Sequence, residues 1–415
     1  MSSVLSEQID PPSSDEITTL DAERTADIEQ KHELISEFLQ TNGYDALLLT
    51  QAAGFAWFTS GGDCSQAGSA EATAALFITP KARVVVTKNV DSARIFDQVL
   101  PQLGFQLKER NWTESWELFL KDLCRSRRIA GDNGFGSTHN VSVELSRMRQ
   151  SFTPLERQRL RSLGRMVAHA VEATARSCRP GRFEAELAGE LAHRLIKRQV
   201  VPMRIQVAAD GKTERYRNGS YGNDRVERFC TISAIGRQHG LCLGAARTVC
   251  FGEVPETLEN AHRRAALVHA AGMHFSQAGW EIGEVWKRVQ RIYEKFGCAN
   301  EWRLATQAEI IGYDVCEEPV RPESDFRLGD GMAVHWHPSV GPALLGDSVL
   351  IGKNSSEILT PMVDWPKFVI EVKGTTVNCP EILRKPRGGE EEEDPLVAET
   401  DDSILEFRFD DSFPG

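Results

Sequence analysis

The fold is decided by the stretch FCTISAIGRQHGLCLGAARTVCFG, residues 229–252. Its two halves, FCTISAIGR and LCLGAARTVCFG, are apolar segments separated by the polar residues Gln238 and His239 and by Gly240. Apolar, β-branched runs favour strands, and a glycine supplies the backbone freedom that a tight turn needs. The stretch therefore predicts a β-hairpin, with His239 as a polar residue at its tip.

Helical patterns lie on both sides of this hairpin. Before it, Thr153-Pro154 opens an amphipathic helix that runs to about Cys178, since proline is favoured at the first helical position. A second helix is predicted over 183–199, and two more over 259–278 and 283–296. Strand-like segments accompany each pair: MRIQVAA from 203, then AEIIGYDV, GMAVHWHP and DSVLIG from 308, 331 and 347. This order is typical of a duplicated α/β half, although no clear sequence repeat accompanies it.

A smaller unit precedes this one. Strands YDALLLT, AALFITP and ARVVVTK, which start at 44, 74 and 82, alternate with helical patterns and predict an α/β domain. The Ser-, Pro- and acid-rich N-terminus and the GGEEEED run predict flexible ends, and ILEFRFDDSF (404–413) predicts an edge strand or a docking segment. We divide the chain into a flexible arm (1–28), an N-terminal α/β domain (29–150), a second α/β domain (151–380) and an acidic flexible tail (381–415).

Composition excludes several classes of protein. The 415 residues are 41% hydrophobic and 26% charged, which suffices for a large core. A net charge of -12 argues against nucleic acid and anionic membranes as partners. No apolar run reaches the about 18 residues that a membrane helix needs, and the N-terminus has no signal-peptide pattern. Nine cysteines without a CxxC pair favour reduced, packed thiols. We expect a cytoplasmic protein.

Five motifs of the second domain, taken in order, resemble the creatinase / aminopeptidase P / prolidase family, which has the pita-bread fold. They are RPGRFE (179–184), the hairpin with its Arg247-Thr248 pair, IGYDVCEEP (311–319), GDGM (329–332), and DSVLI (347–351) followed by Leu359-Thr360. The resemblance covers roughly residues 30–380. It implies an α/β (α+β) protein in which a creatinase-like N-terminal α/β domain precedes a C-terminal pita-bread domain, and it implies a homodimer.

The resemblance also implies where metals would bind. Metallo-members of that family hold two divalent cations with two Asp, one His and two Glu, and carboxylates suit such hard or borderline cations. The matching positions in this chain carry Ser233, Gly244, Glu309, His337 and Gly346. All five have changed, and two glycines and a serine supply no bridging carboxylate for a pair of dications. We therefore expect no metal site and no other cofactor.

Creatinase itself works without metal, using a His as acid/base and Glu residues that orient the substrate. The matching position here is Asn218, whose amide does not exchange protons near neutral pH. His335 and His337, two residues apart on a predicted strand, point to one face. With Glu309 they are weak catalytic candidates for a rewired acid/base or single-metal site.

Four further residues are weak candidates for contacting a substrate. They are Asn218, His239, Glu317 and Glu318. Glu317 and Glu318 precede Pro319 in a loop that the resemblance places over the pocket, where they would contact a cationic ligand. Solvated loop carboxylates and a polar hairpin tip are the simpler interpretation of these residues.

Three functions are consistent with the sequence. The first is a non-metallo pseudo-peptidase or repurposed binding protein that holds a peptide, a small molecule or a partner protein. A histone-chaperone subunit that resembles the same family indicates that the scaffold can serve in this way. The second is a C–N hydrolase that is metal-independent, like creatinase, or uses one metal at Glu309 and His337. The third is an Xaa-Pro aminopeptidase or prolidase-like peptidase, if the five positions are misaligned.

Overall fold

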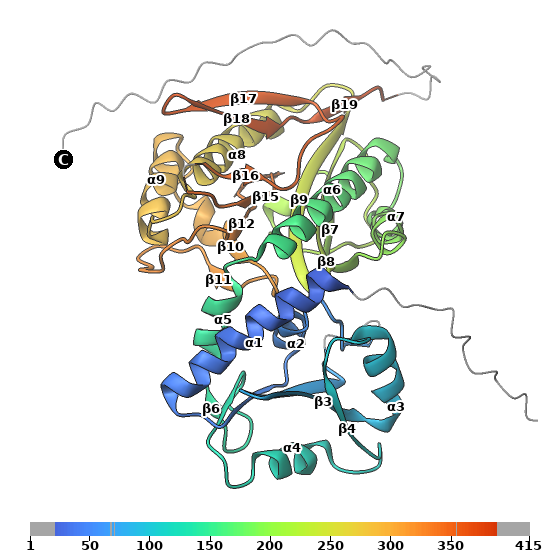
Figure 1. The fold of residues 1–415 in the computed structure, drawn as a ribbon. Coiled ribbons are helices and arrows are strands. Elements are labelled where there is room, and N and C mark those ends of the chain that lie inside the picture. Colours follow the sequence, from blue (N-terminus) through green and yellow to red (C-terminus); the bar gives the residue numbers. More distant parts are fainter. Residues whose placement is uncertain (1–20, 67–68, 70, 354, 388–415) are drawn as a thin grey trace, which may run out of the picture.

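The computed structural model describes residues 21–66, 69, 71–353 and 355–387, and two units follow one another along the chain (Figure 1). The N-terminal unit is built on a six-stranded sheet in the order β4-β3-β2-β1-β5-β6. Strands β1/β2 and β2/β3 pair antiparallel, whereas β3/β4, β1/β5 and β5/β6 pair parallel. The strands are β1 (Ala46–Leu49), β2 (Ala74–Thr79), β3 (Ala82–Lys88), β4 (Gln106–Arg110), β5 (Ile129–Gly131) and β6 (His139–Asn140).

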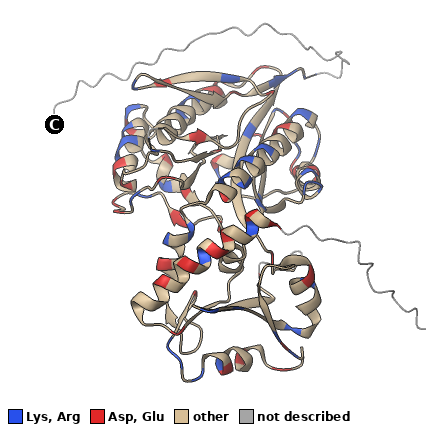
Figure 2. Cartoon of the chain, in the orientation of Figure 1, with Lys and Arg blue, Asp and Glu red and all other residues tan. Residues whose placement is uncertain are grey.

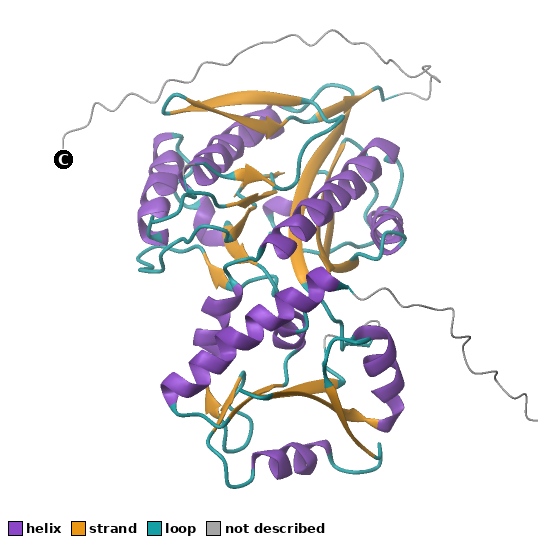
Figure 3. Ribbon diagram, viewed as in Figure 1, coloured by secondary structure: helices purple, strands orange, loops and turns teal. Residues whose placement is uncertain are grey.

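Helices cover both faces of this sheet (Figure 3). Alternate residues of β1 point to opposite faces, so Leu47 and Leu49 pack with helix α1 in one cluster while Leu48 packs with helix α4 in another. The α/β domain that the alternation of strands and helices predicted is therefore present. The helices of this unit are α1 (Ala22–Asn42), α2 (Ala52–Phe58), α3 (Asn89–Ala93), the π-helical segment Arg94–Val99, α4 (Trp116–Cys124) and α5 (Ser142–Arg149).

The start of α1 corrects the expected extent of the N-terminal arm. The Asp21 carboxylate accepts a hydrogen bond from the Arg24 amide at 3.0 Å and caps the helix. Ile28 is fully buried about two turns later. Residues 21–28 are thus the cap and first turns of α1, and only residues 1–20 of the expected arm remain, which lie outside the described residues.

The C-terminal unit consists of two halves, each a helix pair packed on a sheet (Figure 1). In the first half, the four-stranded sheet β19-β9-β8-β7 packs against α6 and α7. The elements are α6 (Pro154–Ser177), α7 (Glu184–Ile196), β7 (Val201–Ala209), the 3-10 turn Lys212–Glu214, β8 (Phe229–Gln238), β9 (Leu241–Phe251) and β19 (Leu383–Lys385). The hairpin predicted from residues 229–252 is confirmed, because β8 and β9 pair from Phe229↔Cys250 to Gln238↔Leu241.

The second half contains a five-stranded sheet in the order β11-β10-β12-β15-β16. Its elements are α8 (Glu256–Phe275), α9 (Ile282–Lys295), the 3-10 turn Glu301–Leu304, β10 (Ala308–Ile311), β11 (Glu318–Pro319), β12 (Ala333–Trp336), β15 (Asp347–Leu350) and β16 (Glu357–Ile358). Two hairpins complete it: β13 (Ser339–Val340) with β14 (Ala343–Leu344), and β17 (Lys367–Val372) with β18 (Thr375–Pro380). The duplicated arrangement predicted from the order of elements is therefore observed.

Strand β19 corrects the other expected terminal boundary. Leu383–Lys385 pair in parallel with β9, so residues at the start of the expected flexible tail belong to the sheet. The acidic run and the predicted edge strand at 404–413 lie outside the described residues.

Helix α1 runs between the two units and carries charges of both signs (Figure 2). Its buried Lys31 donates to Asp27 and to Glu156, both at 2.6 Å. Glu156 closes a capping box with Thr153 at the start of α6 and also accepts a hydrogen bond from the Tyr313 hydroxyl at 2.5 Å. A buried charge needs partners of this kind, and here the partners come from both units and hold them together.

Strand β9 also joins the two halves of the C-terminal unit. The Ala246 amide donates to the Gly346 carbonyl at 2.9 Å, where β9 meets the start of β15. Next to this bridge the buried Arg247 guanidinium donates to Glu172 at 3.2 Å and to Asp347 at 3.0 Å. These contacts fix the position of the inner strands on which the five expected ligand positions lie.

Helix α6 closely approaches the segment after β16 at Gly164, and this contact can be tested. A Cβ at this position would lie 1.9 Å from the Leu359 carbonyl oxygen, whereas a Cβ at the α7 residue Gly189 would meet nothing within 4 Å. We expect Gly164→Ala to lower stability by about 1–3 kcal/mol, because the backbone of α6 must move. The measurement is the urea midpoint followed by circular dichroism.

Gly189→Ala is the matched control in a helix of the same half. We expect it to raise stability by about 0.5–1 kcal/mol, since alanine loses less backbone entropy than glycine in a helix. Equal effects of the two substitutions would show that helix propensity, rather than the contact with Leu359, governs Gly164.

Candidate functional site

The five positions matched to metal ligands come together on the inner strands. Ser233 lies on β8 opposite Ala246 of β9, and Ala246 in turn bridges to Gly346 before β15. Glu309 on β10 lies opposite His335 on β12, with His337 directly after that strand. Gly244, on β9, contacts the His335 ring. The fold thus brings the expected positions to one place, whatever chemistry their side chains now have.

The His335 imidazole occupies the space next to Gly244. A Cβ on Gly244 would lie 2.6 Å from His335 Nε2 and 2.7 Å from Cε1, so no side chain fits there with the ring in place. His335 is 2% exposed, and burial together with the neighbouring His337 lowers its pKa to about 3. The ring is therefore neutral at physiological pH.

Ser348 fixes the orientation of that ring. Its hydroxyl donates to the Gly244 carbonyl at 2.9 Å and accepts from the Gly244 amide at 3.1 Å. Since the hydroxyl hydrogen is used, the 3.1 Å contact with His335 is a hydrogen bond donated by Nδ1 of the ring. The proton of the neutral imidazole thus sits on Nδ1, and Nε2 faces the position where a ligand side chain from residue 244 would start.

Gly346 leaves equally little room. A Cβ there would lie 2.9 Å from the Ala246 Cβ and 3.0 Å from the Ala246 amide nitrogen. The obstacle is the backbone of β9 at the bridge between the two halves, which cannot move as a flexible side chain does. A carboxylate side chain at this position would require β9 and β15 to separate.

Glu309 retains a carboxylate, but its charge is already balanced. The side chain is 3% exposed and accepts a hydrogen bond from His337 Nε2, and Arg204 Nη1 on β7 lies 3.9 Å from its other oxygen. Burial raises the pKa of Glu309, but the charge and hydrogen bond of His337 outweigh burial and hold the pKa below its usual value. The result is an ionised carboxylate between an imidazole and a guanidinium.

This set of side chains does not fit the pair of metals that the family pattern implies. The His335 and His337 rings stack at 26° with centroids 5.1 Å apart, so their nitrogens lie in near-parallel planes instead of converging. His337 Nε2 is used by Glu309. Within the described residues, no group of three or more His, Cys, Asp or Glu is arranged to hold a metal ion.

Two of the other candidates lie elsewhere. His239 sits at the hairpin tip with φ 51°, where its Cβ would lie 2.8 Å from a side chain on Gly61 of the N-terminal unit. Burial and the nearby charges of Arg159 and Arg24 lower its pKa to about 4. Asn218 is exposed, and no hydrogen bond joins it to another described residue. His239 is thus a contact between the units, and Asn218 has no partner that would orient it.

The two loop glutamates have different environments. Glu317 is buried and ion-paired with Arg149 at 2.6 Å, and it also accepts from the Ser146 hydroxyl. It therefore joins α5 to the loop before β11 and is not the solvated carboxylate that the simpler interpretation expected. Glu318 lies 3.7 Å from Arg321 and lines a cavity of about 720 Å³ beside α5.

Arg204 and Ser348 were not predicted as site residues from the sequence. Arg204 is the second residue of MRIQVAA and lies on β7, next to the hairpin strand β8. Nothing in its local pattern indicates that it points to Glu309, 105 residues away in the chain. Ser348 belongs to the DSVLI motif, and its role depends on the identity of residues 244 and 335, which no spacing rule connects.

The contact between Gly244 and His335 can be measured. We expect Gly244→Ala to cost about 1–3 kcal/mol, because the new methyl overlaps the ring. In the double variant Gly244→Ala/His335→Ala the overlap is gone, so the two effects should deviate from additivity by about 0.5–3 kcal/mol. Urea unfolding of the four proteins gives this coupling energy.

A second pair serves as the control for that cycle. Gly189→Ala and His335→Ala lie on different elements that share no contact, and their effects should add. If Gly244→Ala and His335→Ala also add, the ring does not fill the space beside residue 244.

Comparisons with known proteins agree with this fold. Residues 158–358 match the profile of metallopeptidase family M24. Prolidase from Pyrococcus horikoshii OT3 is similar in structure, with a TM-score of 0.70 and 16% identity over 80% of this chain and 99% of that one. Xaa-Pro dipeptidase from Bacillus anthracis gives 0.68 and 17% over 86% and 100%.

A different kind of protein also shares the fold. The N-terminal domain of FACT complex subunit SPT16 from chickpea (Cicer arietinum) gives a TM-score of 0.60 and 10% identity over 81% of this chain and 95% of that one. No curated protein sequence matches the chain significantly. Through residues 158–358 the chain matches metallopeptidase family M24, and it has the pita-bread fold expected from its five motifs.

Proposed function

We propose that this protein is a non-metallo member of its family, a pseudo-peptidase that acts by binding rather than by two-metal hydrolysis. The observation that supports this most directly is the His335 ring, which fills the space beside Gly244. A side chain that fills a ligand position with a neutral, hydrogen-bonded imidazole stabilises the fold without a cation.

The other ligand positions support the same proposal. A pair of dications needs several carboxylates to offset its charge. Of the five positions only Glu309 carries a carboxylate, and His337 and Arg204 already balance it. At Gly346 any side chain would press against the Ala246 Cβ and amide nitrogen of β9.

The remaining polar groups are suited to recognition. His337 and Arg204 are both partly exposed beside the buried Glu309, with side-chain exposures of 12% and 36%. An imidazole and a guanidinium can donate hydrogen bonds to a carboxylate or carbonyl group of a ligand. A peptide or a small polar molecule is therefore the ligand class that we propose for this site.

A second candidate function is metal-independent C–N hydrolysis. The hydrogen bond between Glu309 and His337 favours it, since a carboxylate that orients an imidazole is the arrangement of a general acid/base. His335, by contrast, is buried and held neutral by its low pKa, which makes it a packing residue in either case.

The assembly and location of the protein are also proposals. We propose a homodimer, which light scattering would detect as twice the chain mass of 46.2 kDa. The chickpea SPT16 domain is part of a complex subunit, so a partner protein is a further ligand to consider for this fold. In the described part of the chain no helix is long and apolar enough to span a bilayer. A cytoplasmic location stays a prediction.

Metal titration tests the proposal directly. We expect calorimetry with Mn²⁺, Co²⁺ or Zn²⁺ to show no binding of two equivalents to the metal-free protein, and we expect no cleavage of Xaa-Pro dipeptides with these ions present. Any weak binding at the surface should persist in Glu309→Gln, because that variant removes the only carboxylate among the five positions. Two equivalents bound, lost in Glu309→Gln and accompanied by dipeptide cleavage, would overturn the proposal.

Substrate screening in the presence of a chelator separates binding from metal-free hydrolysis. We expect Xaa-Pro dipeptides, guanidino compounds and simple amides to remain intact with the wild-type protein. Chelator-resistant cleavage that His337→Gln abolishes and His239→Gln leaves unchanged would support the second candidate instead. His239→Gln is the control because its ring lies at the contact between the units, away from Glu309.

A further inference from the structure

A cavity in the N-terminal unit lies outside the residues that match the family. It has a volume of about 860 Å³ and is formed between the end of α4 with the turn after it, residues 121–128, and the loop 135–139 that leads into β6. Pockets of roughly 300–1,000 Å³ are typical of small-molecule sites. Nothing in the family resemblance or in the proposed function accounts for this cavity.

The charged side chains that line the cavity are all basic. Four of the ten lining residues are Lys121, Arg125, Arg127 and Arg128, a fifth is His139, and none is an Asp or Glu. This lining belongs to a chain with a net charge of -12, so the cavity does not simply follow the average composition. A concave surface lined by one sign of charge attracts ligands of the opposite sign.

Two of the arginines are held without a carboxylate. The Arg128 guanidinium lies over the Tyr44 ring at 4.8 Å, and the Arg127 guanidinium lies over the Phe77 ring at 5.5 Å. Within the described residues neither has an ion-pair partner. Aromatic faces orient a guanidinium but leave its full charge and several N–H donors available.

The other two cations have weak, exposed partners. Lys121 pairs with Glu117 at 2.5 Å and Arg125 with Asp122 at 3.6 Å, and all four side chains are 47–79% exposed. Exposed pairs of this kind contribute little stability. Lys121 and Arg125 can therefore turn toward a more strongly charged anion at little cost.

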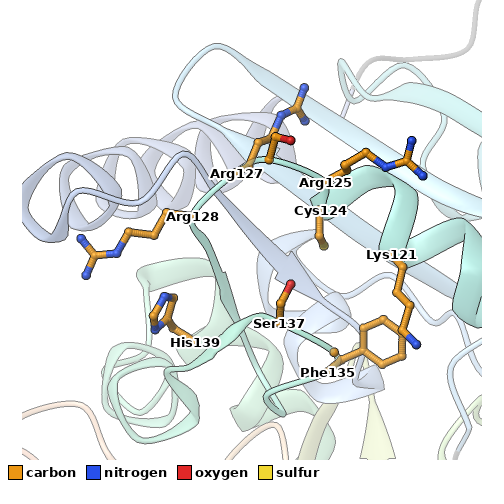
Figure 4. A pocket seen from close by; sticks show the side chains of 10 residues that line it. Lys121, Cys124, Arg125, Arg127, Arg128, Phe135, Ser137 and His139 are labelled. Carbon is orange, nitrogen blue, oxygen red and sulfur yellow. The ribbon is translucent and has the colours of Figure 1, made fainter.

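The remaining lining provides hydrogen-bonding and apolar contacts. Figure 4 shows the Ser137 side chain and the His139 ring between the arginine-rich turn and the loop, with Phe135 next to Lys121. In this view the side chains of Arg125, Arg127 and Arg128 extend outward from the turn in different directions. A ligand with an apolar portion against Phe135 and Cys124 would need the exposed Lys121 and Arg125 side chains to turn toward its anionic group.

We propose that this cavity binds a small phosphorylated molecule. The planar, many-donor guanidinium matches the oxygens of a phosphate group, which accepts two parallel hydrogen bonds from one arginine. Several cations around one cavity favour an anion of more than one charge, such as a mononucleotide or a diphosphate. The proposal concerns the N-terminal unit and does not depend on the function of the Glu309 site.

Calorimetry on the full chain with inorganic pyrophosphate and with AMP as probes tests this proposal. We expect both to bind, more weakly as ionic strength rises. The double variant Lys121→Gln/Arg125→Gln should weaken binding by at least about tenfold, since it removes two charge-assisted hydrogen bonds. Both side chains are exposed, so the variant keeps the packing of Arg127 and Arg128 on their rings.

The matched control is Arg263→Gln/Lys287→Gln. These residues make exposed ion pairs one helical turn away, as Lys121 and Arg125 do, but they lie on α8 and α9. The control should bind both probes as the wild type does. Citrate separates phosphate recognition from plain charge attraction: equally tight binding of citrate, equal losses in the two double variants, or no binding of either probe would each overturn the proposal.

Discussion

The buried guanidinium of Arg247 is the interaction on which the C-terminal unit depends. It lies on β9 and contacts Glu172 of α6, Asp347 of β15 and the Gly346 carbonyl, so one side chain connects a helix and both sheets. A charge without these partners would be costly to bury, because each ion loses its water on folding. The network therefore fixes the spacing of β9 and β15 to within a hydrogen-bond length. It joins the two sheets without the side chains at the five neighbouring positions.

That fixed spacing determines what the inner strands can hold. Since β9 and β15 touch at Ala246 and Gly346, a side chain has no room there. The volume beside Gly244 is instead filled from the opposite strand by His335, whose Nδ1 is tied to Ser348. The two glycine positions are thus closely packed by their neighbours, like the rest of the interior. The Arg204–Glu309–His337 cluster places further charged side chains at the edge of this region.

Local pattern was sufficient to predict the principal helices and strands around the hairpin, but not α2, α5 or the β17–β18 hairpin. The β8–β9 hairpin and α6 follow from a turn glycine, an apolar alternation and a proline at the first helical turn, all of which are local signals. The start of α1 was missed although Asp21 offers a capping carboxylate, because the acid-rich composition around it is also that of a flexible segment. The five positions were found by resemblance. The pairs Gly244–His335 and Arg149–Glu317 were not found, since they join residues from distant parts of the chain and depend on packing that no spacing encodes.

The tight contacts at Gly244 and Gly346 have a consequence for how this chain can evolve. A single substitution by an acidic residue at either position would meet an imidazole ring or a strand backbone, so it would lower stability and be disfavoured by selection. An acidic side chain at residue 244 would need a smaller residue at position 335 as well. These positions can therefore change only together with their neighbours, which limits the single substitutions open to this part of the chain during evolution.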